Sequence, residues 1–429
     1  MLAVIAALAL LVQPDTTFRP PAPADTVEAE IGDELTDGDV SEAVEDVRRW
    51  RVRPILSPST FYSPSRGVGV GGGVAVDHVL SRGDHLQVEA RLVQRLQGAF
   101  AEYVTADPQR ARLYGLFGGA AWTTSRTRFA GHGPSSPADA ELFLDRASAE
   151  AEARLGWSPG TPGRLLIEPV VRARYDRLRG YEETEPGELD EVTAEDLARL
   201  DAIRGQDRYG GEFGLIGVYD GRDLPTMPSR GVYLQGEAAR FEALDGSGLG
   251  FTRVQALGYA FRPALLRLPF IPDRGALFVR ANGVVTREDG GDAPLPWVYL
   301  PTLDGDLLVG YPRSDYVGRD AVSVSAGARG VIGEAIGAFL FEGIAMATLG
   351  AAYDDVFAQF TPRVQFTDAR PAPGEAVPLK PSVSVGMNFR FIDRERALLG
   401  GLVGVGPGGV SLATLRLVYG LGDYRPRLR

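Results

Sequence analysis

The chain has 429 residues, with 54 glycines, 30 prolines and no cysteine. The lack of cysteine excludes disulfides, thiolate nucleophiles and most zinc sites. The formal net charge of −11 argues against nucleic acid as a partner. Most of the acidic surplus is local, because the segment from Asp25 to Val47 holds ten acidic residues and no Lys or Arg.

The N-terminus has the features of a signal peptide. Leu2–Val12 is an uninterrupted apolar run of eleven residues, and a membrane-spanning helix needs ~20. Ala22-Pro23-Ala24 offers a small-x-small cleavage site. We therefore expect a signal peptide over residues 1–24 and an exported mature chain.

An acidic periplasmic tail is expected over residues 25–51. Asp39 can cap a short helix there, with Glu42 as its partner in a capping box. The acidic residues lack the D-x-D-x-D-G spacing of a calcium-binding loop, so a solvated tail is the simpler interpretation.

Nearly the whole chain after residue 50 shows the two-residue period of β-strands. In Ala147–Trp157 the odd positions from Ala149 onward are apolar, and the even positions from Ser148 to Arg154 are polar. This period places the two sets on opposite faces of a strand. A soluble sandwich buries the apolar face, whereas a membrane barrel turns it to lipid and lines its lumen with the polar face.

The connections favour the membrane barrel. When the predicted strands given below are numbered along the chain, the longest connections follow odd-numbered strands, at 126–145, 178–208, 288–318 and 350–379. The connections after even-numbered strands are mostly tight turns. Outer-membrane barrels have long loops on one rim, short turns on the other and an even number of strands. We predict sixteen strands, near 52–63, 67–78, 84–97, 98–106, 111–125, 146–158, 163–177, 209–220, 230–243, 250–262, 275–287, 319–331, 335–349, 380–392, 397–405 and 410–421.

The predicted fold is all-β, a 16-stranded antiparallel transmembrane β-barrel over residues 52–421 with a C-terminal extension over 422–429. Both chain ends fall on the periplasmic rim. Arg and Glu would cost ~2–4 kcal/mol each near the lipid midplane, so the polar face must line the lumen. Trp122 and Trp157 are candidates for the aromatic girdles.

The long, charged connection at 178–208 contains a helix signal. Thr193, followed by Glu195 and Asp196, can cap a helix over roughly 194–204. We interpret this as a small surface helix rather than as a ligand site.

A distinctive turn lies between the strands expected at 209–220 and 230–243. It runs Tyr219-Asp220-Gly221-Arg222-Asp223-Leu224-Pro225 and continues with Pro228, Arg230 and Gly231. The prolines stiffen it, the last glycine permits a sharp turn, and the charged residues can pair with each other and with the backbone. A turn that serves only the fold and a turn that binds a partner are both open interpretations.

This turn, together with the loop-and-strand series from Leu300 to Glu342, resembles the bacterial surface-antigen superfamily, the BamA/TamA-type outer-membrane proteins. The early segment Gly67–Arg95 is also similar to that family's first strands. The resemblance covers about residues 52–421 and implies an outer-membrane β-barrel.

In that family a long extracellular loop folds into the lumen, where its Arg-Gly-aromatic motif meets an acidic residue on strand thirteen. The resemblance places this motif at Val309-Gly310-Tyr311, with Val309 where the family has Arg, and places the acidic partner at Glu342. Arg313 lies two residues after the tyrosine and can replace the missing charge. We therefore hypothesise a contact between Arg313 and Glu342.

The chain departs from the protein-inserting members of that family in two ways. Residues 25–51 are too short for even one POTRA module, so we expect a barrel without POTRA modules. The last strand is followed by Asp423 to Arg429 instead of ending on an aromatic residue.

No catalytic residues, metal ligands or cofactor sites are predicted. The three histidines are His78 and His85, which flank a periplasmic turn, and His132 on an extracellular loop. None lies in a spacing that suggests a nucleophile and an oriented base. Gly71-Gly72-Gly73 lies within a strand, so it is not a phosphate-binding loop.

The sequence therefore predicts a protein of the outer membrane of a Gram-negative-type bacterium. The resemblance implies a role in the assembly or translocation of protein or lipid, with outer-membrane lipid and a separate periplasmic protein as partners. The alternatives are a passive porin-like channel and a structural surface barrel. Bilayer conductance discriminates between them, because an inward loop at 288–318 would plug the lumen.

Overall fold

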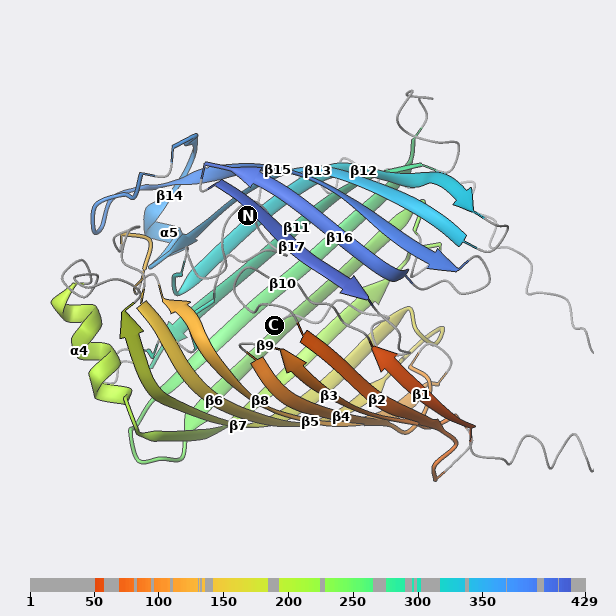
Figure 1. Ribbon diagram of the computed structural model, residues 1–429, viewed down its shortest axis with the longest axis horizontal. Helices are drawn as coiled ribbons and strands as arrows, with labels where there is room; N and C mark the ends of the chain where they lie inside the picture. Colours follow the sequence, from red (N-terminus) through yellow and green to blue (C-terminus); the bar gives the residue numbers. More distant parts are fainter. Residues whose placement is uncertain are drawn as a thin grey trace, which may run out of the picture.

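The computed structural model describes most of the chain between Arg51 and Leu417 as one curled sheet (Figure 1). The predicted signal peptide, most of the acidic tail with its short helix, and the C-terminal extension lie outside the described residues. The stretches outside are 1–50, 58–68, 81–82, 94–95, 109–110, 130, 132, 136–141, 184–192, 224–227, 265–274, 290–294, 297–298, 302–316, 336–338, 368, 392–396, 408 and 418–429.

The strands follow the predicted order closely, with ends that differ by a few residues. They are β1 (Arg51–Ser57), β2 (Gly69–Asp77), β3 (His85–Val93), β4 (Leu96–Val104), β5 (Leu113–Phe129), β6 (Leu142–Trp157), β7 (Leu165–Glu183), β8 (Asp207–Asp220), β9 (Gly231–Ala243), β10 (Gly250–Pro263), β11 (Ala276–Glu288), β12 (Asp320–Ala335), β13 (Phe339–Tyr353), β14 (Phe360–Val364), β15 (Val377–Phe391), β16 (Ala397–Gly406) and β17 (Gly409–Leu417). The helices are α4 (Ala194–Ile203) and the single turn α5 (Val356–Gln359).

Sixteen of these strands form the predicted antiparallel barrel. Each strand from β1 to β12 pairs with the next, β13 pairs with β15, and β15, β16 and β17 complete the series. The pairings in the described part of the chain run from β1 to β17 and do not join these two strands to each other. The additional strand β14 pairs in parallel with the start of β15.

The two rims of the barrel differ as the sequence predicts. The connections after β5, β7, β11 and β13 are long, and α4, α5 and β14 lie on the rim that they form (Figure 1). We call this the long-loop rim and the opposite one the short-turn rim. The predicted helix is present as α4, and the side chain of Thr193 accepts a hydrogen bond from the N–H of Asp196 at 3.1 Å. Within the described residues, no helix has the length and hydropathy needed to cross a bilayer.

The two faces of the sheet show the predicted polarity. On β3, Val88 and Leu92 are 45% and 61% exposed, whereas Gln87 and Glu89, on either side of Val88, are 7% and 6% exposed. The polar residues therefore face the enclosed interior and the apolar residues face outward. This arrangement is the inverse of a soluble fold.

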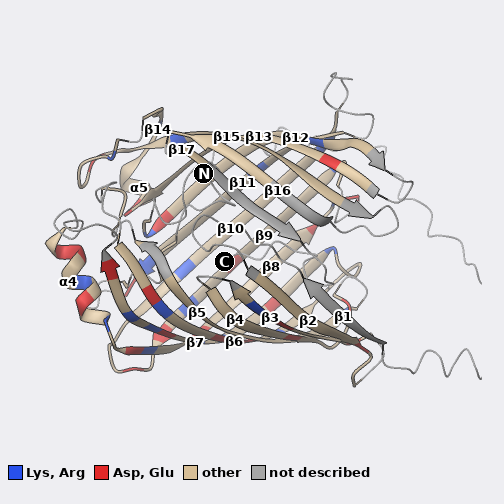
Figure 2. Cartoon of the chain, in the orientation of Figure 1, with Lys and Arg blue, Asp and Glu red and all other residues tan. Residues whose placement is uncertain are grey.

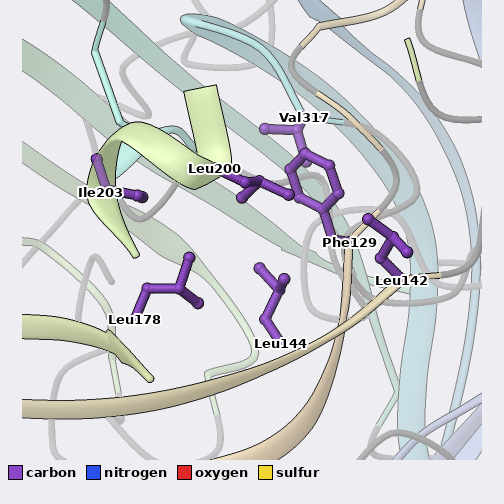
Figure 3. Packing of buried hydrophobic residues seen from close by; sticks show 7 residues of the cluster. All are labelled: Phe129, Leu142, Leu144, Leu178, Leu200, Ile203 and Val317. Atoms are coloured by element: carbon purple, nitrogen blue, oxygen red, sulfur yellow. The ribbon is translucent and has the colours of Figure 1, made fainter. Parts of the chain in front are cut away.

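An apolar cluster fastens α4 to the long-loop rim (Figure 3). Leu200 and Ile203 of the helix pack against Phe129 of β5 and Leu178 of β7. Val317, from the connection that precedes β12, joins the same cluster. The helix thus links loops that are far apart in sequence, and its amphipathic pattern supplies the contact.

Candidate functional site

The inner wall from β6 to β9 carries ion pairs centred on Arg172 of β7. The Nε atom of Arg172 lies 2.6 Å from Oε2 of Glu152 on β6. Its Nη1 atom contacts the carboxylates of Glu212 on β8 and Glu237 on β9. Arg172, Glu212 and Glu237 are only 6%, 3% and 5% exposed. One guanidinium thus serves three carboxylates in a largely buried position.

Neighbouring side chains complete this charge network. Arg154 donates to Glu152 at 2.8 Å, and Arg174 lies 3.2 Å from Glu212. The amide of Gln255 on β10 donates to Glu237 at 2.9 Å. Each carboxylate around Arg172 therefore has a second partner, as buried charges require.

Strand register brings these residues together. Glu152 is the ladder partner of Arg172, and Arg172 is the ladder partner of Glu212. Directly opposite residues on one face of an antiparallel pair lie close enough for their side chains to interact. The sequence predicted that Glu152 and Arg154 face the lumen, but it did not identify their partners.

Apolar layers lie on both sides of the network. Toward the short-turn rim, Leu166, Ile216 and Tyr233 belong to one buried cluster. Toward the long-loop rim, Phe241 and Phe251 stack with ring centroids 4.9 Å apart. The charged layer is therefore enclosed between two apolar ones, which keeps bulk water from it and strengthens its electrostatics.

The connection after β11 reaches this inner wall. The ring centroid of Tyr299 lies 4.9 Å from that of Phe241 and 5.6 Å from that of Phe251. The guanidinium of Arg253 donates to the Tyr299 carbonyl oxygen. Tyr299 is 3% exposed, and burial raises the pKa of its phenol. This part of the predicted inward loop therefore contacts the lumen wall.

Glu342 of β13 has partners on both neighbouring strands. Its carboxylate contacts the guanidinium of Arg329 on β12, and Asn388 on β15 donates to it at 3.1 Å. Glu342 is 1% exposed. These two contacts therefore stabilise its buried carboxylate, a role that was predicted for Arg313. Arg313 lies outside the described residues, as do Val309, Gly310 and Tyr311, and the contact between Arg313 and Glu342 stays a prediction.

The charged residues of the turn between β8 and β9 hold the turn together. The guanidinium of Arg222 lies 2.6 Å from Asp220 and 4.6 Å from the ring centroid of Tyr233. Asp223 accepts hydrogen bonds from the backbone N–H groups of Ser229 and Arg230 at 3.0 Å and 3.2 Å.

Glycine is required where this turn enters β9. Gly231 has a φ of +107°, and a Cβ there would lie 2.3 Å from the carbonyl oxygen of Gly221. Tyr219 points outward and is 43% exposed, Pro228 is buried, and Pro225 lies outside the described residues. The contacts support the interpretation of a turn that serves the fold.

The histidines at the turn between β2 and β3 have structural partners. His85 Nδ1 lies 2.8 Å from Asp77, and His78 Nδ1 accepts from the N–H of Gly83 at 3.0 Å. His132 lies outside the described residues. In the described part of the chain, no three His, Cys, Asp or Glu residues form a group that could hold a metal ion.

Comparisons with known proteins identify the architecture. BamA from Haemophilus ducreyi, in a crystal structure lacking POTRA domains 1–3, matches 86% of this chain and 69% of its own with a TM-score of 0.57 and 12% identity. The chain has the barrel fold of BamA. CdiB from Escherichia coli matches 85% of this chain and 62% of its own, with a TM-score of 0.52 and 9% identity. No family model matches the sequence, and no curated protein matches it either.

The predicted resemblance is therefore confirmed for the fold of this BamA-type barrel. The charge network around Arg172 was missed, because its members lie on four different strands and the long β7–β8 connection separates Arg172 from Glu212. The available signal was the presence of Arg and Glu at lumen-facing positions of several strands, and pairing them needed the register.

Proposed function

We propose that this chain is an integral outer-membrane β-barrel that takes part in the assembly or translocation of protein or lipid at that membrane. The observation that carries the proposal is the polarity of the barrel. On β15, Val383, Val385 and Met387 are 50–60% exposed, whereas Ser382 and Ser384, on either side of Val383, are 3% and 2% exposed. Such an outward apolar belt is stable in lipid and costly in water.

The interior supports a role beyond that of an open pore. The lumen wall carries a buried charge network, and Tyr299 of the β11–β12 connection packs onto that wall. The BamA-type fold supports assembly or translocation as the role. The proposed partners are outer-membrane lipid and a separate periplasmic protein, and the proposed role needs no catalytic step.

Depletion of the protein in its native bacterium tests this role. We expect a fall in the amounts of other outer-membrane proteins, or a change in the lipids of that membrane, before growth stops. A census of both that stays unchanged would contradict the proposal. Restoration by the wild-type gene is the control for indirect effects.

The polar lumen wall also favours a second candidate, a passive channel. Planar-bilayer recordings separate the two. Large, steady currents in the intact protein that do not change when residues 302–318 are deleted indicate a porin. Small currents that rise on this deletion indicate a lumen closed by its own loop.

A further inference from the structure

The segment that contains α5 and β14 lies on the outside of the barrel. It covers an apolar cluster formed by Ala351 and Tyr353 of β13 and Val377 of β15. Tyr353 lies eleven residues from the inward-facing Glu342 on the same strand, so the two point to opposite faces. Val377 has the same parity as the outward-facing Val383. These outward residues are 0–4% exposed because α5 and β14 cover them.

Polar contacts fix the segment in this position. Asp320 of β12 accepts from the N–H of Val356 at 2.9 Å. The Gln365 N–H donates to the Leu379 carbonyl at 2.9 Å. The buried ammonium of Lys380 donates to the carbonyl oxygens of Thr367 and Ala369 at 2.8 Å and 2.7 Å. Together these contacts hold the segment against the long-loop ends of β12 and β15.

The exposed side of this segment, which we call its aromatic face, carries phenylalanines, and the Phe360 ring lies 6.4 Å from that of Tyr353 on β13. Phe357 and Phe366 are 75% and 77% exposed, Phe360 is 49% exposed and Val364 is 40% exposed. Several strongly exposed apolar side chains on one short segment indicate a surface that contacts something other than water. The Arg287 guanidinium lies 5.5 Å from the Phe357 ring centroid, which is a cation–π contact.

The height of the segment matches a membrane interface. Near the short-turn rim, the outward rings of Phe341 and Phe389 lie 5.0 Å apart. Tyr353 lies twelve residues further along β13, which corresponds to ~30 Å along the barrel axis at ~3.3 Å per residue and a tilt of ~40°. The apolar band of such barrels is ~25 Å tall and has aromatic girdles at both edges. The aromatic face therefore lies at the edge of the band nearest the long-loop rim.

The opposite side of the barrel has no need of such a segment. On β8, Tyr219 and Tyr209 are 43% and 48% exposed and lie ten residues apart, so the strand itself supplies aromatic residues near both edges. Beyond Tyr209 the outward residues are polar, as Asp207 and its partner Arg177 show.

We propose that α5 and β14 form an aromatic anchor that inserts into the lipid headgroup and acyl-chain boundary at the long-loop rim. The inference rests on the proposed membrane-spanning function. Its partner is the lipid of that leaflet, because the aromatic face continues the outward apolar belt of β13 and β15. The anchor supplies the aromatic girdle at this part of the long-loop rim, where the outward-facing Tyr353 of β13 is itself buried.

Site-directed spin labelling tests the anchor directly, because the natural chain has no cysteine. The test variants are Phe366→Cys and Phe357→Cys, both at strongly exposed positions. Val383→Cys on the apolar belt is the lipid control, and Leu244→Cys, 67% exposed at the long-loop rim, is the water control. Each labelled protein is reconstituted in vesicles of phosphatidylcholine and phosphatidylglycerol, and the folded fraction is selected by its heat-modifiable gel mobility.

We expect the label at Phe366 and at Phe357 to collide with an aqueous nickel chelate several-fold less often than the label at Leu244. Oxygen accessibility should lie between the values at Leu244 and Val383. Nickel accessibility equal to that at Leu244 for both test positions would overturn the anchor and would assign this face to water or a soluble partner. A label at Val383 that behaves as in water would instead overturn the membrane-spanning function.

Discussion

The two sides of this barrel line the lumen by different means. From β6 to β9 the inner wall is charged, with Arg172 at the centre of three carboxylates. On β12, β13 and β15 it is built from small residues such as Ser325 and Thr348, whose hydroxyls lie 2.9 Å apart. Figure 2 shows the contrast, since the ribbons of β6 and β7 carry many blue and red segments, whereas the described part of β15 is mostly tan.

The difference teaches that each side is sensitive to a different kind of change. The charged side depends on a balance in which Arg154, Arg172 and Arg174 each contact more than one carboxylate. The small-residue side depends on close approach, because a Cβ on Gly327 of β12 would lie 2.3 Å from the carbonyl oxygen of Ala345. We therefore expect charge removal to damage the first side and added volume to damage the second.

The largest effect is expected for Arg172→Met. The substitution leaves Glu152, Glu212 and Glu237 without their shared cation, and breaking a buried ion pair in this way costs ~3–5 kcal/mol. The measurement is the free energy of unfolding in urea from lipid vesicles. Arg240→Met is the matched control, because Arg240 is half exposed and pairs with Glu242 at the surface, where a pair contributes ~0–1 kcal/mol. Equal losses of unfolding free energy in the two variants would show that the buried network contributes no more to stability than a surface ion pair.

The buried ion pair between Glu342 and Arg329 on the small-residue side sharpens the comparison. Glu342→Gln leaves the Arg329 guanidinium with an amide, and we expect a loss of ~1.5–3 kcal/mol, as for hydrogen bonds to charged groups. A double-mutant cycle with Arg329→Met measures the coupling between the two side chains. A coupling near zero would show that Arg329 is not the main partner of Glu342.

Added volume should matter more than lost polarity on the small-residue side. Gly327→Ala places a methyl group against backbone and against the ring of Phe278, and we expect a loss of ~1–3 kcal/mol. Ser325→Ala, two residues away on the same face, removes one hydrogen bond and should cost ~1 kcal/mol or less. Urea unfolding of both variants tests the order, and a larger loss for Ser325→Ala would reverse our interpretation.

An effect on stability smaller than that of Arg172→Met is expected at the contact between the loop and the charged side. Tyr299→Ala removes two aromatic contacts, for which we expect ~1–2 kcal/mol. The stronger signal should be faster proteolysis of the β11–β12 connection and a higher bilayer conductance. Tyr299→Phe keeps the ring and is the control. Unchanged cleavage and conductance in Tyr299→Ala would show that this contact does not hold the loop in the lumen.

Much of the fold could be predicted from local pattern. The strand Ala147–Trp157 was predicted from its alternation, and in the structure Trp157 is 51% exposed while Ser148 is 5% exposed. The helix after Thr193 was predicted from its capping residues and is present as α4. These features depend on neighbouring residues alone, so the sequence contains their physical cause.

The candidate site was much less predictable. Glu342 was identified as a buried acid in need of a partner, but Arg329 was not recognised as that partner, since the two belong to neighbouring strands and meet only through their register. The covering segment at β14 was predicted as an ordinary long loop. Its docking on Tyr353 depends on the shape of the finished barrel.

The sequence by itself determined the strands, their two faces and the rim on which the long loops lie, because a two-residue period and the length of a connection are local properties. The tertiary structure decided which charges meet in the lumen and which loop covers the outer wall. Those contacts join residues that lie far apart in the chain, and the register and closing curvature of the whole sheet set their distances.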